Sequence, residues 1–149
     1  MKNTTALDTL LALSGREADS AAERLGRAVA QRSDANQRLA MLNQLRDEYA
    51  QRLRNAADNG LSFASYRNYQ RFMEKIEQAI AGQQDIEAAA RMRAEYAQQE
   101  WQARRHEGKT WELLRDRAQQ VMDRKAGVAE RKLMDEFAAR AGRRAQEAG

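Results

Sequence analysis

The 149 residues of this chain include no proline. Proline breaks a helix interior because it lacks an N–H group and its ring clashes with the preceding turn. A chain without proline can therefore form very long helices, and the abundant Ala, Arg, Glu, Gln and Leu are strong helix formers. Charged residues make up 32% of the chain and aromatic residues 6%, a composition typical of coiled coils. We expect an all-α fold.

The first segment carries apolar and small residues at intervals of three and four, which is the spacing of a coiled-coil seam. We predict a first helix over about 5–57. Arg32 and Asn36 interrupt its stripe, and polar seam residues often set the register of a coiled coil. The predicted seam positions are Ala18, Ala22, Leu25, Val29, Leu39, Leu42, Tyr49 and Leu53.

The one strong break in the helical pattern is Asp58-Asn59-Gly60. Glycine adopts positive φ freely and asparagine tolerates it, so either residue can end a helix. Ser62 and Ser65 can cap the helix that follows. We expect the chain to reverse over about 58–66, through a turn or a short helix near 61–66.

The same apolar spacing then continues over about 66–144, so the second helix is longer than the first. Gly82, Gly108 and Gly127 interrupt it and are interpreted as bends or points of close packing. We predict a single coiled-coil domain spanning 1–149, an antiparallel two-helix hairpin. Acidic residues precede basic residues by four positions at Glu23/Arg27, Asp34/Arg38, Glu48/Arg52, Glu87/Arg91, Glu100/Arg104 and Glu136/Arg140, a favourable helical orientation.

The chain lacks the residues that several classes of chemistry require. The chain has no cysteine, which excludes disulfides and sulfur-ligated metals, and its one histidine, His106, is too few ligands for a metal site. No glycine-rich loop follows a strand, and a thin hairpin offers no cavity that would desolvate a pair of carboxylates. We therefore expect neither an enzyme nor a cofactor or metal site. The first residues do not read as a signal peptide and no long apolar run is present, which favours a cytoplasmic protein.

Lysine and arginine exceed aspartate and glutamate by 26 to 22, and the whole excess falls after residue 100. A basic last third can face an acidic protein, a nucleic acid or a lipid headgroup. It can equally be a solvated helix face.

Two stretches resemble the FliJ family, the small coiled-coil component of the bacterial flagellar protein export apparatus (a type III secretion system). They are NGLSFASYRNYQRFMEKIEQAI from Asn59 to Ile80 and RKLMDEFAARAGRR from Arg131 to Arg144. The chain length and the opening ALDTLLAL also match, so the similarity covers essentially the whole chain. The resemblance implies a two-helix coiled coil similar to the rotary ATP synthase stalk, located in the cytoplasm and peripheral to the inner membrane at the flagellar base.

The resemblance also implies partners. It implies that the coiled coil sits in the pore of the hexameric export ATPase and promotes assembly and activity of the ring, as in other members of the family. It also implies that the protein links the ring to the export gate protein FlhA and binds chaperones of late export substrates. The implied gate-binding face departs from the family pattern at Arg38, Leu45 and Gln83. On this sequence the face comprises Phe72, Ile76, Ala79, Gln83, Leu42 and Tyr49.

The end of the hairpin that holds both termini is implied to enter the ATPase ring. Its cations are expected to face an acidic ring lining. Its apolar part is expected to comprise Leu7, Leu10, Leu11 and Leu13 together with Met134 and Phe137. The predicted ring-binding residues are Leu7, Leu10, Arg131, Lys132, Met134, Phe137 and Arg140.

Three alternatives remain open at this point. The homologous stalk of a virulence-type secretion injectisome is the closest. A basic helical arm that binds nucleic acid is less favoured, because the last third lacks an aromatic–basic stacking platform. A free-standing oligomeric coiled-coil scaffold is the third.

Overall fold

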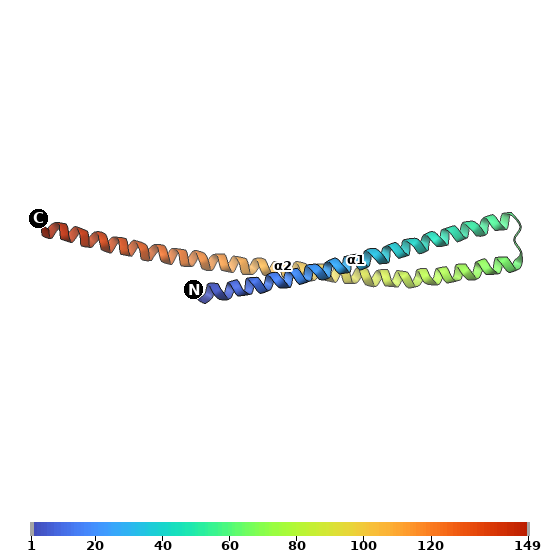
Figure 1. The fold of residues 1–149 in the computed structure, drawn as a ribbon, viewed down its shortest axis with the longest axis horizontal. Coiled ribbons are helices and arrows are strands. Elements are labelled where there is room, and N and C mark those ends of the chain that lie inside the picture. The colour runs from blue at the N-terminus through green and yellow to red at the C-terminus, as the bar shows by residue number, and fades with distance from the viewer. Residues whose placement is uncertain (1, 149) are drawn as a thin grey trace. The chain divides into compact units, whose positions relative to one another are not determined.

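Two helices account for the fold. The structure is a computed structural model that describes residues 2–148, with side chains described from residue 5 onward. Helix α1 is Lys2–Asp58 and helix α2 is Phe63–Ala148 (Figure 1). The prediction of an all-α, antiparallel two-helix hairpin with a longer second helix is confirmed. Among the described residues, neither helix contains an apolar stretch of the length needed to span a membrane.

The chain divides into two compact units, which we describe separately. The hairpin unit is Asp19–Ala103 and contains the turn. The terminal unit combines Met1–Ala18 with Arg104–Gly149. Each unit takes residues from both helices, because each helix continues from one unit into the other.

The seam between the helices follows a heptad pattern, with steps that alternate between four and three residues along α1 and, on α2, as far as Trp111. On α1 the buried and half-buried seam residues are Leu7, Leu11, Ser14, Ala18, Ala21, Leu25, Ala28, Arg32, Ala35, Leu39, Leu42, Arg46, Tyr49, Leu53 and Ala56. On α2 they are Tyr69, Met73, Ile76, Ile80, Gln83, Glu87, Ala90, Ala94, Ala97, Trp101, Arg104, Gly108, Trp111 and Ala118. A strict seven-residue repeat keeps one narrow stripe facing the partner helix.

Two predicted seam positions are wrong. Ala22 is exposed and Val29 is 51% exposed, whereas the neighbouring Ala21 and Ala28 occupy the seam. The fully packed positions are mostly alanine, including Ala21, which is 1% exposed. Small side chains allow the two backbones to approach closely, so the most apolar residue of a local run need not be the one that is buried.

The turn forms through caps on both helices. Gly60 has φ of 87°, and its N–H donates to the Ala57 carbonyl at 3.3 Å, as expected for a left-handed residue that ends a helix. Ser62 then caps α2, because its Oγ accepts from the Ser65 N–H at 3.2 Å and its carbonyl accepts the first helical bond from Tyr66. The separate short helix considered near 61–66 does not form, since this cap starts α2 at Phe63.

In the terminal unit the helices meet closely at Gly108. A Cβ placed there would lie 3.4 Å from the Ser14 Oγ, so Gly108 is a close-packing point. Arg104 donates to the Glu17 carboxylate at 2.8 Å nearby. After Ala118 every described residue of α2, from 119 to 148, is exposed. This segment therefore continues beyond the seam, in agreement with the prediction that the second helix is longer than the first.

The six predicted acid–base pairs four residues apart are not ion pairs in the structure. Glu100 instead accepts from Arg24 across the seam at 2.7 Å, and Arg104 contacts Glu17 and Glu107. Spacing along one helix gives the charges within that helix, whereas Arg24 and Arg104 pair with acidic residues of the facing helix. These cross-helix pairs therefore help to fix the pairing of α1 with α2.

Candidate protein-binding surface

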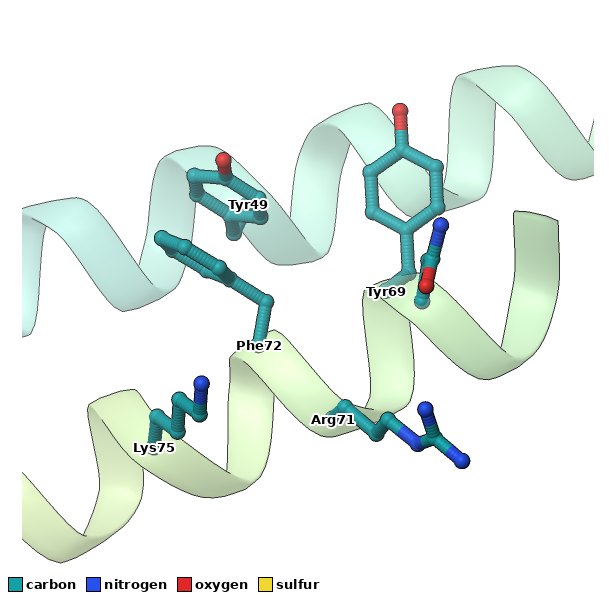
Figure 2. Close-up of a pocket in the computed structure, with 6 residues that line it drawn as sticks. Tyr49, Tyr69, Arg71, Phe72 and Lys75 are labelled. Atoms are coloured by element: carbon teal, nitrogen blue, oxygen red, sulfur yellow. The ribbon is translucent and has the colours of Figure 1, made fainter.

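An aromatic cluster lies near the turn in the hairpin unit. The Tyr49 ring on α1 stacks on the Phe72 ring on α2, with centroids 4.4 Å apart and planes 17° apart. Tyr69 meets Tyr49 edge-on at 6.2 Å, and the Arg52 guanidinium lies 5.5 Å from the Tyr49 ring centre. Figure 2 shows the facing rings of Tyr49 and Phe72, with Lys75 one turn along α2. The cluster joins the two helices while Phe72 stays 42% exposed.

The pocket at this cluster is cationic as well as aromatic. Tyr49, Asn68, Tyr69, Arg71, Phe72 and Lys75 line it (Figure 2), and no acidic residue is among them. In the part of the chain that the structure describes, neither Arg71 nor Lys75 takes part in an ion pair. Rings with an open face beside unpaired cations can hold an apolar group and a carboxylate from a partner. We call this surface the aromatic pocket.

The structure gives the predicted gate-binding residues three different environments. Phe72 and Ala79 are exposed, and Leu42 and Tyr49 are half-buried. Ile76 is only 4% exposed and packs in the seam. All of them lie in the hairpin unit, but only Tyr49 and Phe72 meet in the aromatic pocket.

Gln83 has a structural partner. It is 9% exposed, and its Nε2 donates to the Ala35 carbonyl at 3.1 Å. A buried amide with a satisfied donor holds the two helices in one register. Its side chain therefore packs inside the hairpin at a position that the family resemblance assigns to a partner.

Three residues that belong with this surface were not predicted from the sequence. Arg71 and Lys75 line the aromatic pocket, and Ile86 is 54% exposed on the same edge of α2. The available signal was spacing, because Phe72, Ala79 and Ile86 follow one another at intervals of seven. Residues seven apart lie almost in line along a helix, so Ile86 continues the row that Phe72 begins.

The predicted ring-binding residues fall in the terminal unit in two separate sets. Leu11 lines a groove with Gly108, Lys109 and Glu112, so the nearby Leu7 and Leu10 on α1 lie beside the adjacent turns of α2. The α2 set, Arg131, Lys132, Met134, Phe137 and Arg140, is exposed in the segment beyond Ala118. The thirteen residues of α2 from Ala118 to Arg131 span about 20 Å. The two sets therefore lie on separate stretches of the terminal unit, and their binding to the ring stays a prediction.

The exposed segment carries large apolar side chains of its own. Phe137 is 75% exposed, Met134 68% and Leu133 67%. His106 is exposed, and no group of three or more potential metal ligands occurs among the described residues. The arrangement of rings, exposed aliphatic groups and unpaired cations is suited to binding other proteins.

The fold and this surface define a two-helix coiled-coil protein that exposes aromatic and basic side chains. Comparison with known proteins gives the family. The family described as Flagellar FliJ protein matches residues 1–147, and the chain belongs to that family. The Flagellar FliJ protein of Salmonella typhi is 30% identical over 142 residues, covering 95% of this chain and 97% of that protein. The Flagellar FliJ protein of Escherichia coli (strain K12) is 28% identical over 142 residues, again covering 95% of this chain and 97% of that protein.

Membership in the flagellar family confirms the resemblance read from the Asn59–Ile80 and Arg131–Arg144 stretches. It also confirms, at the level of the family, the prediction of a component of flagellar protein export. The family match favours the flagellar prediction over the injectisome alternative.

Proposed function

We propose that this protein is the cytoplasmic stalk of the flagellar export apparatus, peripheral to the inner membrane at the flagellar base. In this role it promotes assembly and activity of the hexameric export ATPase, couples the ring to the cytoplasmic domain of the gate protein FlhA, and binds export chaperones. The protein acts by binding and carries out no catalysis itself. One observation carries the proposal: Phe72, stacked on Tyr49, is exposed beside unpaired cations at a position where the family resemblance implies gate contact.

The aromatic pocket supports gate binding on energetic grounds. Aromatic residues and arginines contribute most of the binding energy at many protein interfaces, especially where a ring fills a pocket on the partner. Phe72 keeps an accessible face while Tyr49 holds the other, so it does not need to rearrange before binding. A preformed contact loses little conformational entropy on association.

The exposed α2 segment supports ATPase contact in the same way. Met134 and Phe137 offer apolar area, and Arg131, Lys132 and Arg140 supply positive charge beside them. Every described residue of 119–148 is exposed. A helix that exposes apolar and basic side chains next to one another can contact a ring lined by carboxylates.

The gate contact is tested by pull-down of the FlhA cytoplasmic domain with the wild-type chain and with Phe72→Ala. We expect binding to weaken about ten-fold or more in the variant, because truncating an interface aromatic removes a large contact. Helicity by circular dichroism should stay unchanged, since Phe72 is exposed. Tyr96→Ala is the matched control: Tyr96 is an aromatic residue on α2 that is 70% exposed and lies outside the aromatic pocket.

Ile76→Ala serves a different purpose in the same experiment. Because Ile76 packs in the seam, its truncation should lower the free energy of unfolding by about 2–4 kcal/mol, and any loss of binding should follow that destabilisation. Unchanged gate binding by Phe72→Ala contradicts the gate assignment. Absence of ATPase stimulation by the wild-type chain contradicts the stalk role.

A further inference from the structure

A second groove lies on the same edge of the hairpin unit as Phe72. Its lining comes from both helices: Gln31, Asp34, Ala35 and Arg38 on α1, and Gln83, Ile86, Ala90 and Arg93 on α2. Ile86 is the large apolar side chain in this groove, and it is 54% exposed. We call this surface the Ile86 groove.

The two surfaces belong to one row. Phe72, Ala79, Ile86 and Arg93 stand seven residues apart on α2, so all four flank the seam on the same side. Seven residues of helix rise about 10.5 Å. The row therefore offers apolar contacts at steps that match the heptad repeat of another helix, and that no extended strand reproduces with its two-residue repeat.

The charges along this row have one predominant sign. Arg71 and Lys75 line the aromatic pocket, and Arg38 and Arg93 line the Ile86 groove. Asp34 is the acidic residue among the two linings. None of the four cations forms an ion pair with a described residue. An acidic partner would therefore gain charge complementarity without first breaking an internal ion pair.

We infer that the edge from Phe72 to Arg93 binds one amphipathic helix of a partner, with apolar residues at heptad spacing and aspartate or glutamate on its flanks. The partner helix packs as a third helix against α1 and α2, and places one apolar side chain beside Phe72 and another beside Ile86. Its carboxylates meet Arg71, Lys75, Arg38 and Arg93. This inference rests on the proposed function in one respect: we assign the helix to the export gate.

The test uses the full chain and two probes. The first is a labelled synthetic helix of about 21 residues, six turns, with leucine at heptad spacing and glutamate on the flanks; a second version carries lysine in place of glutamate. Fluorescence anisotropy measures their binding to the chain. The second probe is the FlhA cytoplasmic domain. We expect the glutamate peptide to bind more weakly as salt rises, because exposed charges are screened, and we expect the lysine peptide not to bind.

Two variants and two matched controls locate the contact. Ile86→Ser and Arg93→Glu should each weaken the glutamate peptide and the gate domain about ten-fold. Met92→Ser and Arg91→Glu should leave both unchanged. Met92 is 68% exposed, and Arg91 flanks the seam opposite Arg93, because one follows the buried Ala90 and the other precedes the buried Ala94. Circular dichroism confirms that all four variants keep the wild-type helicity.

The outcomes separate this inference from the proposed function. Peptide binding that depends on Ile86 and Arg93, without gate binding, supports the acidic helix and overturns the gate as its source. Gate binding that needs Phe72 but is indifferent to Ile86 and Arg93 overturns the extended surface and leaves the proposed function intact. Equal binding of the glutamate and lysine peptides, or binding of neither, overturns the inference.

Discussion

Gly60 and Gly82 have different backbone conformations, the first in the turn and the second inside a helix. Gly60 has a φ angle of 87°, which residues that carry a Cβ atom rarely adopt. Gly82 lies inside α2 with helical geometry, and a Cβ added there would meet no heavy atom within 4 Å. The first glycine is therefore required by the turn, whereas the second only weakens the helix that contains it.

Alanine at these two positions should change stability in opposite directions. Gly60→Ala should lower the free energy of unfolding by about 1 kcal/mol, because the left-handed conformation strains a Cβ. Gly82→Ala should raise it by about 0.5–1 kcal/mol, because alanine loses less backbone entropy in a helix. Urea unfolding followed by circular dichroism measures both. A shift of the same sign in the two variants would contradict the assigned roles.

Residue type and spacing predicted the turn at Asp58-Gly60 and a cap at Ser62, because those features depend on neighbours along the chain. They did not predict the environment of Gln83. Its hydrogen bond reaches the Ala35 carbonyl, and that contact joins residues 48 positions apart. The same limit explains Ile76, which the resemblance assigned to a partner face. A partner that is distant in sequence decides burial at both positions.

The elements show a similar division. Three–four spacing predicted two long helices, since periodicity is a property of each helix alone. The exact seam was harder, because alanines are nearly everywhere and only the facing helix determines which of Ala21 and Ala22 is covered. The division of the predicted ring-binding residues into two sets also depends on where the facing helix lies. Its α1 residues lie beside α2, whereas its α2 residues lie beyond Ala118.

The two parts of α2 should differ in local stability. Residues 76–97 include six buried side chains, among them Ile76, Ile80 and Ala90, whereas 119–148 buries none of its described side chains. Helices gain most of their stability from tertiary packing, and regions with few buried contacts open locally. We expect amides in 119–148 to exchange hydrogen at least ten-fold faster, as hydrogen-exchange mass spectrometry of the free chain can measure. Equal protection would show that the exposed segment is covered in solution.

At the scale of the whole molecule, the chain holds little of its apolar surface in a core. None of the large side chains in the described range is fully buried, and 18 large hydrophobic residues remain exposed in the two units together. A fold that buries so little gains stability when a partner covers it, in proportion to the partner's concentration relative to its dissociation constant. The exposed residues are thus consistent with a protein that works in an assembly.

The two proposed functions use surfaces in different units, so they should be separable. Phe137→Ala should abolish most of the ATPase stimulation and leave binding of the FlhA domain within two-fold of wild type, because Phe137 is 75% exposed in the terminal unit and Phe72 belongs to the hairpin unit. Phe72→Ala should do the reverse. ATPase assays and gate pull-downs on both single variants and the double variant measure this separation. Independent sites give additive effects, whereas loss of gate binding in Phe137→Ala, with helicity retained, would mean that one partner reaches across both units.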